Sequence, residues 1–126
     1  MPTFDTVRVN QLDKDTTAWF AELLTVIETL DAHAYVQLMT DDVVLQLSDG
    51  TVLTGRDEVE RALAAAWAPL SSLTHHERNI YGTAEHFAHE TEVEIRTKDG
   101  AALTSVTTSW IDRAGNGLLR SARLYG

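Results

Sequence analysis

The sequence predicts an α+β fold in which three N-terminal helices pack on a mostly antiparallel sheet. Helical periodicity is concentrated in the first 67 residues, and the alternation typical of strands occupies most of the chain after residue 73. A short strand pair is also expected around Asp49-Gly50, between the second and third helices. Because helices and strands are segregated along the chain, the class is α+β.

The first helix is expected over residues 16–30. Apolar side chains recur there at three- and four-residue spacing, which places them on one helix face: Trp19, Phe20, Leu23, Leu24, Ile27 and Leu30. Asp13 or Asp15 can cap the helix start, because a carboxylate accepts hydrogen bonds from the free N–H groups of the first turn.

Two further helices complete the predicted helical layer. A shorter helix over residues 32–40 follows Asp31. The third helix covers residues 56–67 and carries acidic residues in its first turn, which suit the positive end of the helix dipole. Pro69 ends it, since proline cannot continue the backbone hydrogen bonding of a helix.

The remaining elements are strands separated by glycine-containing turns. They are expected over residues 43–48, 51–55, 74–82, 86–97, 102–112 and 118–125. In the stretch 86–97, side chains alternate between two faces, of which one is acidic and the other is mainly apolar. The first face carries Glu90, Glu92 and Glu94, and the second carries Thr91, Val93 and Ile95.

Length and composition predict a single domain over residues 1–126, with residues 1–14 as a possible N-terminal arm. The chain has no cysteine, which excludes disulfides, thiolate nucleophiles and cysteine-bound metals. A net charge of -9 argues against nucleic acid as a partner. The sequence shows no signal peptide and no apolar run long enough to span a membrane, so a cytoplasmic location and no membrane partner are expected.

Three passages resemble the SnoaL-like branch of the NTF2-like superfamily, which has the ketosteroid isomerase-like fold. They are "DAHAYVQLMTDDVVLQL", "TGRDEVERAL" and "IDRAGNGLLRSARLY", and they occur in the family's order and spacing. The resemblance covers nearly the whole chain from Thr16 onward. It implies a cystatin-like cone, in which a curved sheet and the helices enclose a central pocket, and it implies that homodimers are common. It does not imply one activity, because this fold hosts several.

The catalytic groups of two relatives are missing from the matching positions. Leu23, Leu47 and Thr107 take the places of the ketosteroid isomerase tyrosine, base and second aspartate. Arg123 takes the place of one aspartate of limonene epoxide hydrolase. A leucine cannot accept a proton, so the isomerase mechanism is not expected here. The hydrolase mechanism is not expected either, because Arg123 replaces an aspartate and the long strand has no clear Arg-x-Asp motif.

The same resemblance implies a mostly apolar pocket with a few hydroxyl groups. Its expected ligand-binding residues are Trp19, Leu23, Tyr35, Leu47, Trp67, Thr91, Ser105 and Thr107. Pockets of this composition are typical of small-molecule sites. The aromatic residues could stack on a flat ligand, and the alternative is that they simply pack in the core.

His89 and His75 are the candidate catalytic residues. Histidine exchanges a proton near neutral pH and is a frequent general acid or base. The resemblance implies that His89 points inward from the long strand, and that His75 matches a histidine near the start of the preceding strand. The alternatives are a hydrogen-bonded structural role for His89 and a surface position for His75.

The expected function is that of a pocket protein for a small apolar molecule. It could be a cofactor-free isomerase, lyase, cyclase or hydrolase, with Thr107 and Tyr35 orienting the substrate. The alternatives are a non-catalytic ligand-binding protein and a dimerisation module. No cofactor is expected, and no metal site is expected, since the five histidines lack HExxH spacing. A homodimer is expected.

Overall fold

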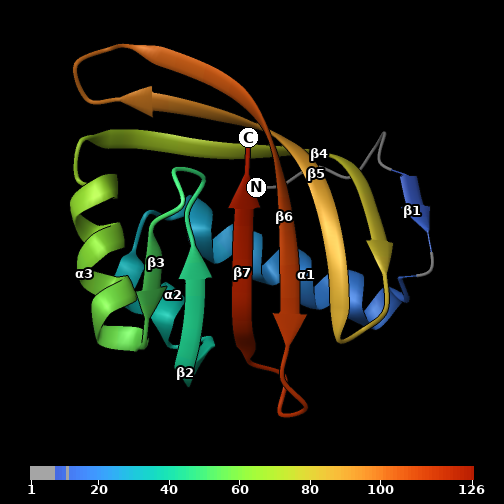
Figure 1. Ribbon diagram of the computed structural model, residues 1–126. Coiled ribbons are helices and arrows are strands. Elements are labelled where there is room, and N and C mark those ends of the chain that lie inside the picture. Colours follow the sequence, from blue (N-terminus) through green and yellow to red (C-terminus); the bar gives the residue numbers. More distant parts are fainter. Residues whose placement is uncertain (1–7, 11) are drawn as a thin grey trace.

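The structure is a computed structural model that describes residues 8–10 and 12–126. Within this part of the chain, seven strands form one sheet in the order β1-β4-β5-β6-β7-β2-β3 (Figure 1). The elements in chain order are β1 (Arg8–Asn10), α1 (Lys14–Glu28), α2 (Ala32–Val36), β2 (Met39–Gln46), β3 (Val52–Thr54), α3 (Arg56–Trp67), β4 (Leu70–Gly82), β5 (His86–Thr97), β6 (Ala102–Arg113) and β7 (Leu119–Tyr125).

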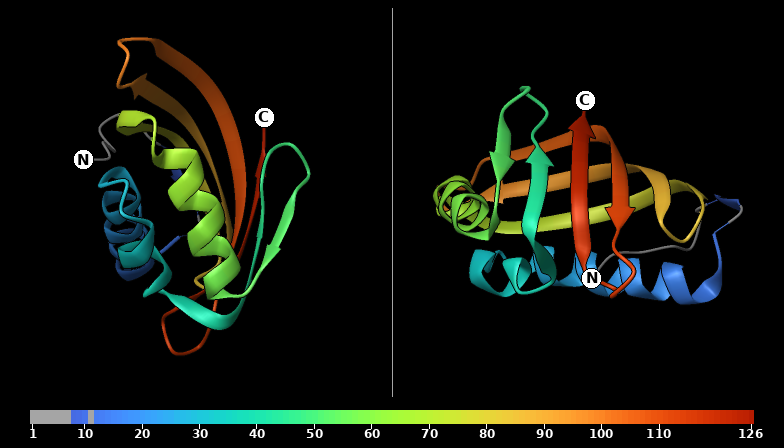
Figure 2. Two further views of the ribbon diagram at one scale, coloured as in Figure 1. Left: turned by 90° about the vertical axis from the view of Figure 1, so that its left-hand side faces the viewer. Right: turned by 60° about the horizontal axis from the view of Figure 1, so that its bottom comes forward.

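The sheet is curved, and all three helices lie on its concave side (Figure 2). The long strands β4, β5 and β6 run antiparallel, as do the pairs β6–β7 and β2–β3. Among the strands that the structure describes, only the pairs β1–β4 and β2–β7 are parallel. The predicted α+β class and the mostly antiparallel sheet are therefore confirmed. Among the described residues, no helix is long and apolar enough to cross a membrane.

Helix α1 begins two residues earlier and ends two residues earlier than the periodicity predicts. Asp13 caps its start by accepting a hydrogen bond from the Thr16 backbone N–H at 2.7 Å. At the other end, Leu30 adopts a φ of 59°, a left-handed conformation that cannot continue a helix. The apolar face of α1 packs into the core through Phe20 and Leu23, which are fully buried.

The second helix is shorter than expected, because the chain joins the sheet sooner. The prediction of a helix over residues 32–40 is wrong beyond Gln37, the C-cap of α2. Strand β2 begins at Met39, which pairs with Leu119 of β7, and the Leu119 N–H donates to the Leu38 carbonyl. Met39 is completely buried, so tertiary pairing overrides the local helical pattern.

Strand β4 is longer than predicted, because Leu70 already pairs with Thr97 of β5. At the N-terminus, residues 8–10 form β1, which pairs with β4, so that part of the expected arm is a strand. The rest of the expected arm lies largely outside the described residues.

The concave face has the alternation that the sequence predicts. His89 pairs with Ser109, Thr91 with Thr107, and Val93 with Ser105 across β5 and β6. These residues share one face of the sheet, because side chains two positions apart in a strand point the same way. The core lies between this face and the helices and includes Phe20, Leu23, Phe87 and Ile111.

Candidate functional site

Two buried carboxylate–imidazole pairs lie on the helix-covered face of the sheet. In the first, His89 Nδ1 lies 2.8 Å from Glu77 Oε2, and both side chains are closed to solvent, at 4% and 0% exposure. Strand β5 supplies the histidine and the neighbouring strand β4 supplies the carboxylate. A carboxylate beside Nδ1 favours the tautomer that carries its proton there.

A β-bulge helps to place this pair. The register between β4 and β5 shifts between Glu77 and Asn79, and the extra residue, Arg78, is exposed. Both Glu77 and Ile80 are consequently buried, although strict alternation would put them on opposite faces. Sequence reasoning missed Glu77. The available signal was its position two residues after His75, which puts both residues on one face of a strand.

The second pair joins α1 to β4. His75 Nδ1 lies 3.1 Å from Glu28 Oε2, and the His75 backbone N–H donates to the same oxygen at 2.7 Å. Both side chains are less than one-tenth exposed. Burial lowers the pKa of His75, and the hydrogen bond to Glu28 opposes this shift only in part. The neutral imidazole of His75 is therefore favoured in the folded protein.

The two pairs form one polar cluster inside the protein. His75 and Glu77 are two residues apart on β4, and the charges of Glu77 and His89 both act on the pKa of His75. Phe20 of α1 packs against the His89 member of the cluster, with its ring edge-on to the His89 ring at a centroid distance of 4.6 Å. Burying four ionisable groups is costly unless they are paired, and such clusters are concentrated at functional sites.

The predicted ligand-binding residues fall into two groups. Three are buried, namely Leu23, Tyr35 and Thr91. Five are half-buried, namely Trp19, Leu47, Trp67, Ser105 and Thr107. The Thr91 hydroxyl donates its hydrogen to the His76 backbone carbonyl, at a distance of 3.3 Å.

Two of the predicted aromatic residues stack on each other. Tyr35 and Trp67 have ring centroids 6.0 Å apart and nearly parallel planes. Burial raises the pKa of Tyr35, so its hydroxyl keeps its proton across the physiological range. Trp67 also lines a cleft of about 530 Å³ between the end of α1, α2, the end of α3 and the start of β4.

Trp19 has a structural role at the other end of α1. Its indole N–H donates to the Gly117 carbonyl at 2.8 Å. The Arg113 guanidinium lies 4.8 Å from the centre of its ring, within the range of a cation–π interaction. These contacts attach α1 to the turn between β6 and β7.

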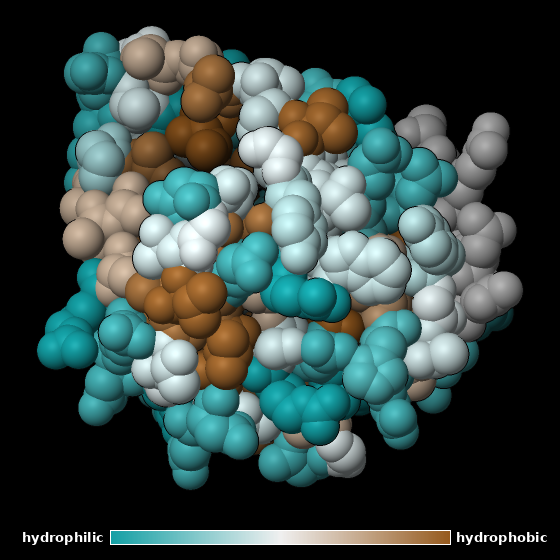
Figure 3. Space-filling view, in the orientation of Figure 1, coloured by the Kyte–Doolittle hydropathy of each residue, from teal (hydrophilic) through white to brown (hydrophobic). Residues whose placement is uncertain are grey.

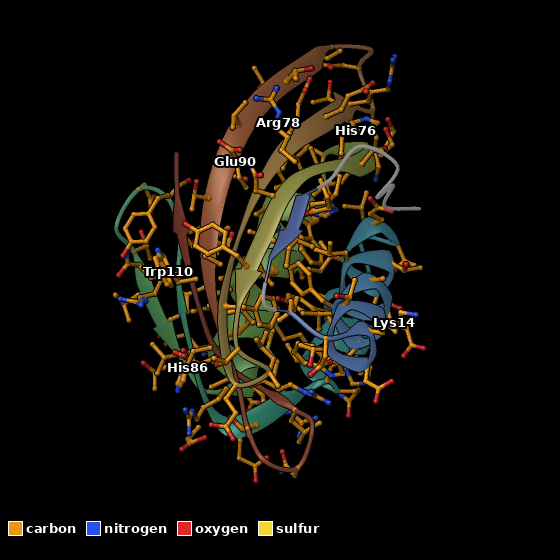
Figure 4. The ribbon with its side chains drawn as sticks, turned by 90° about the vertical axis from the view of Figure 1, so that its right-hand side faces the viewer. Lys14, His76, Arg78, His86, Glu90 and Trp110 are labelled. Atoms are coloured by element: carbon orange, nitrogen blue, oxygen red, sulfur yellow. The ribbon has the colours of Figure 1, made fainter. Side chains whose placement is uncertain are left out.

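The other three histidines lie at the surface, and each has an acidic neighbour. His76 Nε2 lies 3.7 Å from Glu94, and His33 Nδ1 lies 3.1 Å from Glu60. His86 bonds Asp112, which also accepts a hydrogen bond from the Ser121 hydroxyl. His76 and His86 are on strands, on the opposite side of the sheet from the buried cluster, and Figure 4 shows His86 on the side turned away from α1.

The model of the SnoaL-like domain family matches residues 20–121, which is most of the chain. The matched region contains all four members of the buried cluster. No curated protein matches the sequence.

Solved structures share the fold at low sequence identity. A putative SnoaL-like polyketide cyclase from Shewanella denitrificans has a TM-score of 0.77 at 9% identity, with 90% of each chain covered. The epoxide hydrolase/cyclase-like enzyme SalBIII, described in pyran ring formation in salinomycin, has a TM-score of 0.76 at 14% identity, with 89% and 90% covered. RV0760c from Mycobacterium tuberculosis, solved with estradiol-17beta-hemisuccinate, has a TM-score of 0.74 at 18% identity, with 88% and 92% covered.

Proposed function

This chain belongs to the SnoaL-like domain family, and from that membership we propose that it binds a small apolar molecule in a central pocket and acts on it without a cofactor. The reaction would be an isomerisation, elimination, cyclisation or hydrolysis that proceeds by moving a proton. The observation that supports this proposal is the buried pair of His89 and Glu77.

His89 is the proposed proton carrier. With its Nδ1–H donated to Glu77, the imidazole keeps a lone pair on Nε2, which can accept a proton. The Glu77 carboxylate would stabilise the imidazolium that forms, because opposite charges attract strongly where water is excluded. His75 is the second proposed proton carrier, since its neutral ring is favoured and can also accept a proton.

The proposed binding space lies against the half-buried part of the concave face. Leu47, Trp67 and Leu124 would supply apolar contacts, and Ser105 and Thr107 would supply hydroxyl groups. An apolar wall with few polar groups fits a small apolar ligand. The steroid derivative bound by RV0760c is a ligand of this general kind, which supports the proposal by analogy of fold.

Native mass spectrometry of the gently purified protein tests for a bound molecule. A discrete extra mass on the folded protein is expected, and its identity would indicate the reaction to assay. Binding studies with small apolar probes would complete the test. A protein that carries no extra mass and binds none of these probes would contradict the proposed pocket.

A homodimer is proposed as well, formed through the convex face of the sheet. Tyr81, Trp110 and Tyr125 are each more than two-fifths exposed. Tyr81 and Trp110 both pair with Ala88 of β5, so they flank it in one row across three strands. Figure 4 shows Trp110 on the side of the sheet away from α1, and Figure 3 shows apolar patches among polar surface in the view of Figure 1. Exposed aromatic side chains are typical of interfaces.

A further inference from the structure

The carboxylate of Glu77 uses only one of its two oxygens within the described part of the chain. Oε2 lies 2.8 Å from His89 Nδ1. Oε1 is buried and has no hydrogen-bond partner among the described residues. The Glu77 side chain as a whole is closed to solvent. A buried carboxylate oxygen without a hydrogen-bond donor is costly, so this oxygen calls for an explanation.

Two polar residues next to Glu77 in the sheet, Thr91 and His75, already have hydrogen-bond partners of their own. The Thr91 hydroxyl, directly across from Glu77 on β5, donates to the His76 carbonyl. The backbone N–H of His75 donates to Glu28, and the Nδ1 atom of its ring also lies against that carboxylate. A donor for Glu77 Oε1 would therefore come from a molecule other than these side chains.

We infer that Glu77 Oε1 accepts a hydrogen bond from a hydroxyl group of the ligand, so that the site selects a small apolar alcohol or phenol. This inference rests on the proposed function and names its ligand class. A ketone of the same skeleton presents an oxygen lone pair in place of the hydrogen. The carboxylate would repel that oxygen, so the ketone would bind more weakly.

The geometry of the pair makes Glu77→Gln a sharp test. The glutamine carbonyl oxygen can accept the His89 Nδ1–H, just as Glu77 Oε2 does. Its amide nitrogen then occupies the position of Oε1 and presents two hydrogens. The substitution thus replaces an acceptor with a donor at nearly the same volume, and the preference should move from the alcohol toward the ketone.

The experiment measures the affinities of 1-tetralol and 1-tetralone by isothermal titration calorimetry. We expect the unmodified protein to bind the alcohol at least about tenfold more tightly, since hydrogen bonds to charged groups are strong. Glu77→Gln should abolish or reverse this preference. Glu90→Gln is the matched control, because Glu90 accepts from Asn79 and belongs to the opposite face of β5. The control should keep the preference for the alcohol.

The possible failures are distinct. Equal affinity of the unmodified protein for both probes would overturn the inference and leave the proposed pocket intact. An alcohol preference that persists in Glu77→Gln would assign the selection to another residue and also overturn it. If neither probe binds, both the inference and the proposed pocket for a small apolar molecule are contradicted. If circular dichroism shows that Glu77→Gln does not fold, the affinities of the unmodified protein for the alcohol and the ketone still test the inference.

Discussion

Glu28 and His75, 47 positions apart in the chain, are joined through a single carboxylate oxygen. Oε2 of Glu28 accepts the His75 backbone N–H and also lies against the Nδ1 atom of its ring. Among the described residues, β1 pairs with β4 from Asn79 to Tyr81, and His75 lies outside this paired stretch. The last turn of α1 thus supplies the acceptor for the His75 backbone N–H and holds a buried imidazole in place.

The low pKa of His75 predicts that acid destabilises the fold. Burial disfavours the charged imidazole, so in the range just below the ordinary pKa of 6.5 the unfolded chain binds more protons than the folded one. The free energy of unfolding should therefore fall as the pH drops below about 6.5 and should level off above it. Urea denaturation between pH 5 and pH 8 measures this dependence.

His75→Gln should flatten this part of the pH profile, because glutamine does not titrate. His33→Gln serves as the control, since His33 is exposed and pairs with Glu60 at the surface. Identical profiles for the unmodified protein and His75→Gln would show that His75 does not cause the acid sensitivity.

Removal of the N-cap side chain of α1 should lower the free energy of unfolding. Asp13 accepts the Thr16 backbone N–H, whereas Asp15 is exposed in the first turn and contributes only through the helix dipole. Asp13→Ala should lower the free energy of unfolding measurably, because the Thr16 N–H loses its acceptor, and Asp15→Ala should lower it clearly less. Chemical denaturation compares the two, and an equal loss in both variants would argue against the cap.

Catalysis by His89 predicts a large loss of turnover in His89→Gln. General acid–base catalysis typically contributes about 10²–10⁴-fold to a rate, so a loss of this order is expected with the substrate identified from the bound mass. His86→Gln is a matched control, because His86 also pairs with a carboxylate but lies at the surface, on the side of the sheet away from α1. Unchanged turnover in both His89→Gln and His75→Gln would remove these residues from the mechanism.

The proposed dimer predicts that a charge at Trp110 separates the subunits. Trp110→Lys would place a charge inside an apolar interface, where it is poorly solvated, so sedimentation velocity should show a shift from dimer to monomer. Leu103→Lys is the control, since Leu103 is also strongly exposed but belongs to the other face of the sheet. A dimer that survives Trp110→Lys would have to use another surface.

Much of the fold could be predicted from the sequence, because local patterns report which face of an element is buried. The three- and four-residue spacing around Phe20 and Leu23 predicted α1, and the alternation around Thr91 predicted the inward face of β5. The boundaries were less predictable. Met39 belongs to β2 and not to a helix, because its backbone pairs with Leu119, eighty positions further along the chain.

For the candidate site, the resemblance carried by the sequence implied that His89 faces inward, and strand alternation alone puts His75 and Glu77 on one face of their strand. Only the tertiary structure decided which carboxylate meets which imidazole. The pairing of His89 with Glu77 depends on the register between β4 and β5, and that of His75 with Glu28 depends on how α1 packs against β4. Periodicity in the sequence indicates which side chains of one element are buried. Which side chain a buried residue contacts depends on the distances between elements, and these distances are fixed only when the whole chain packs.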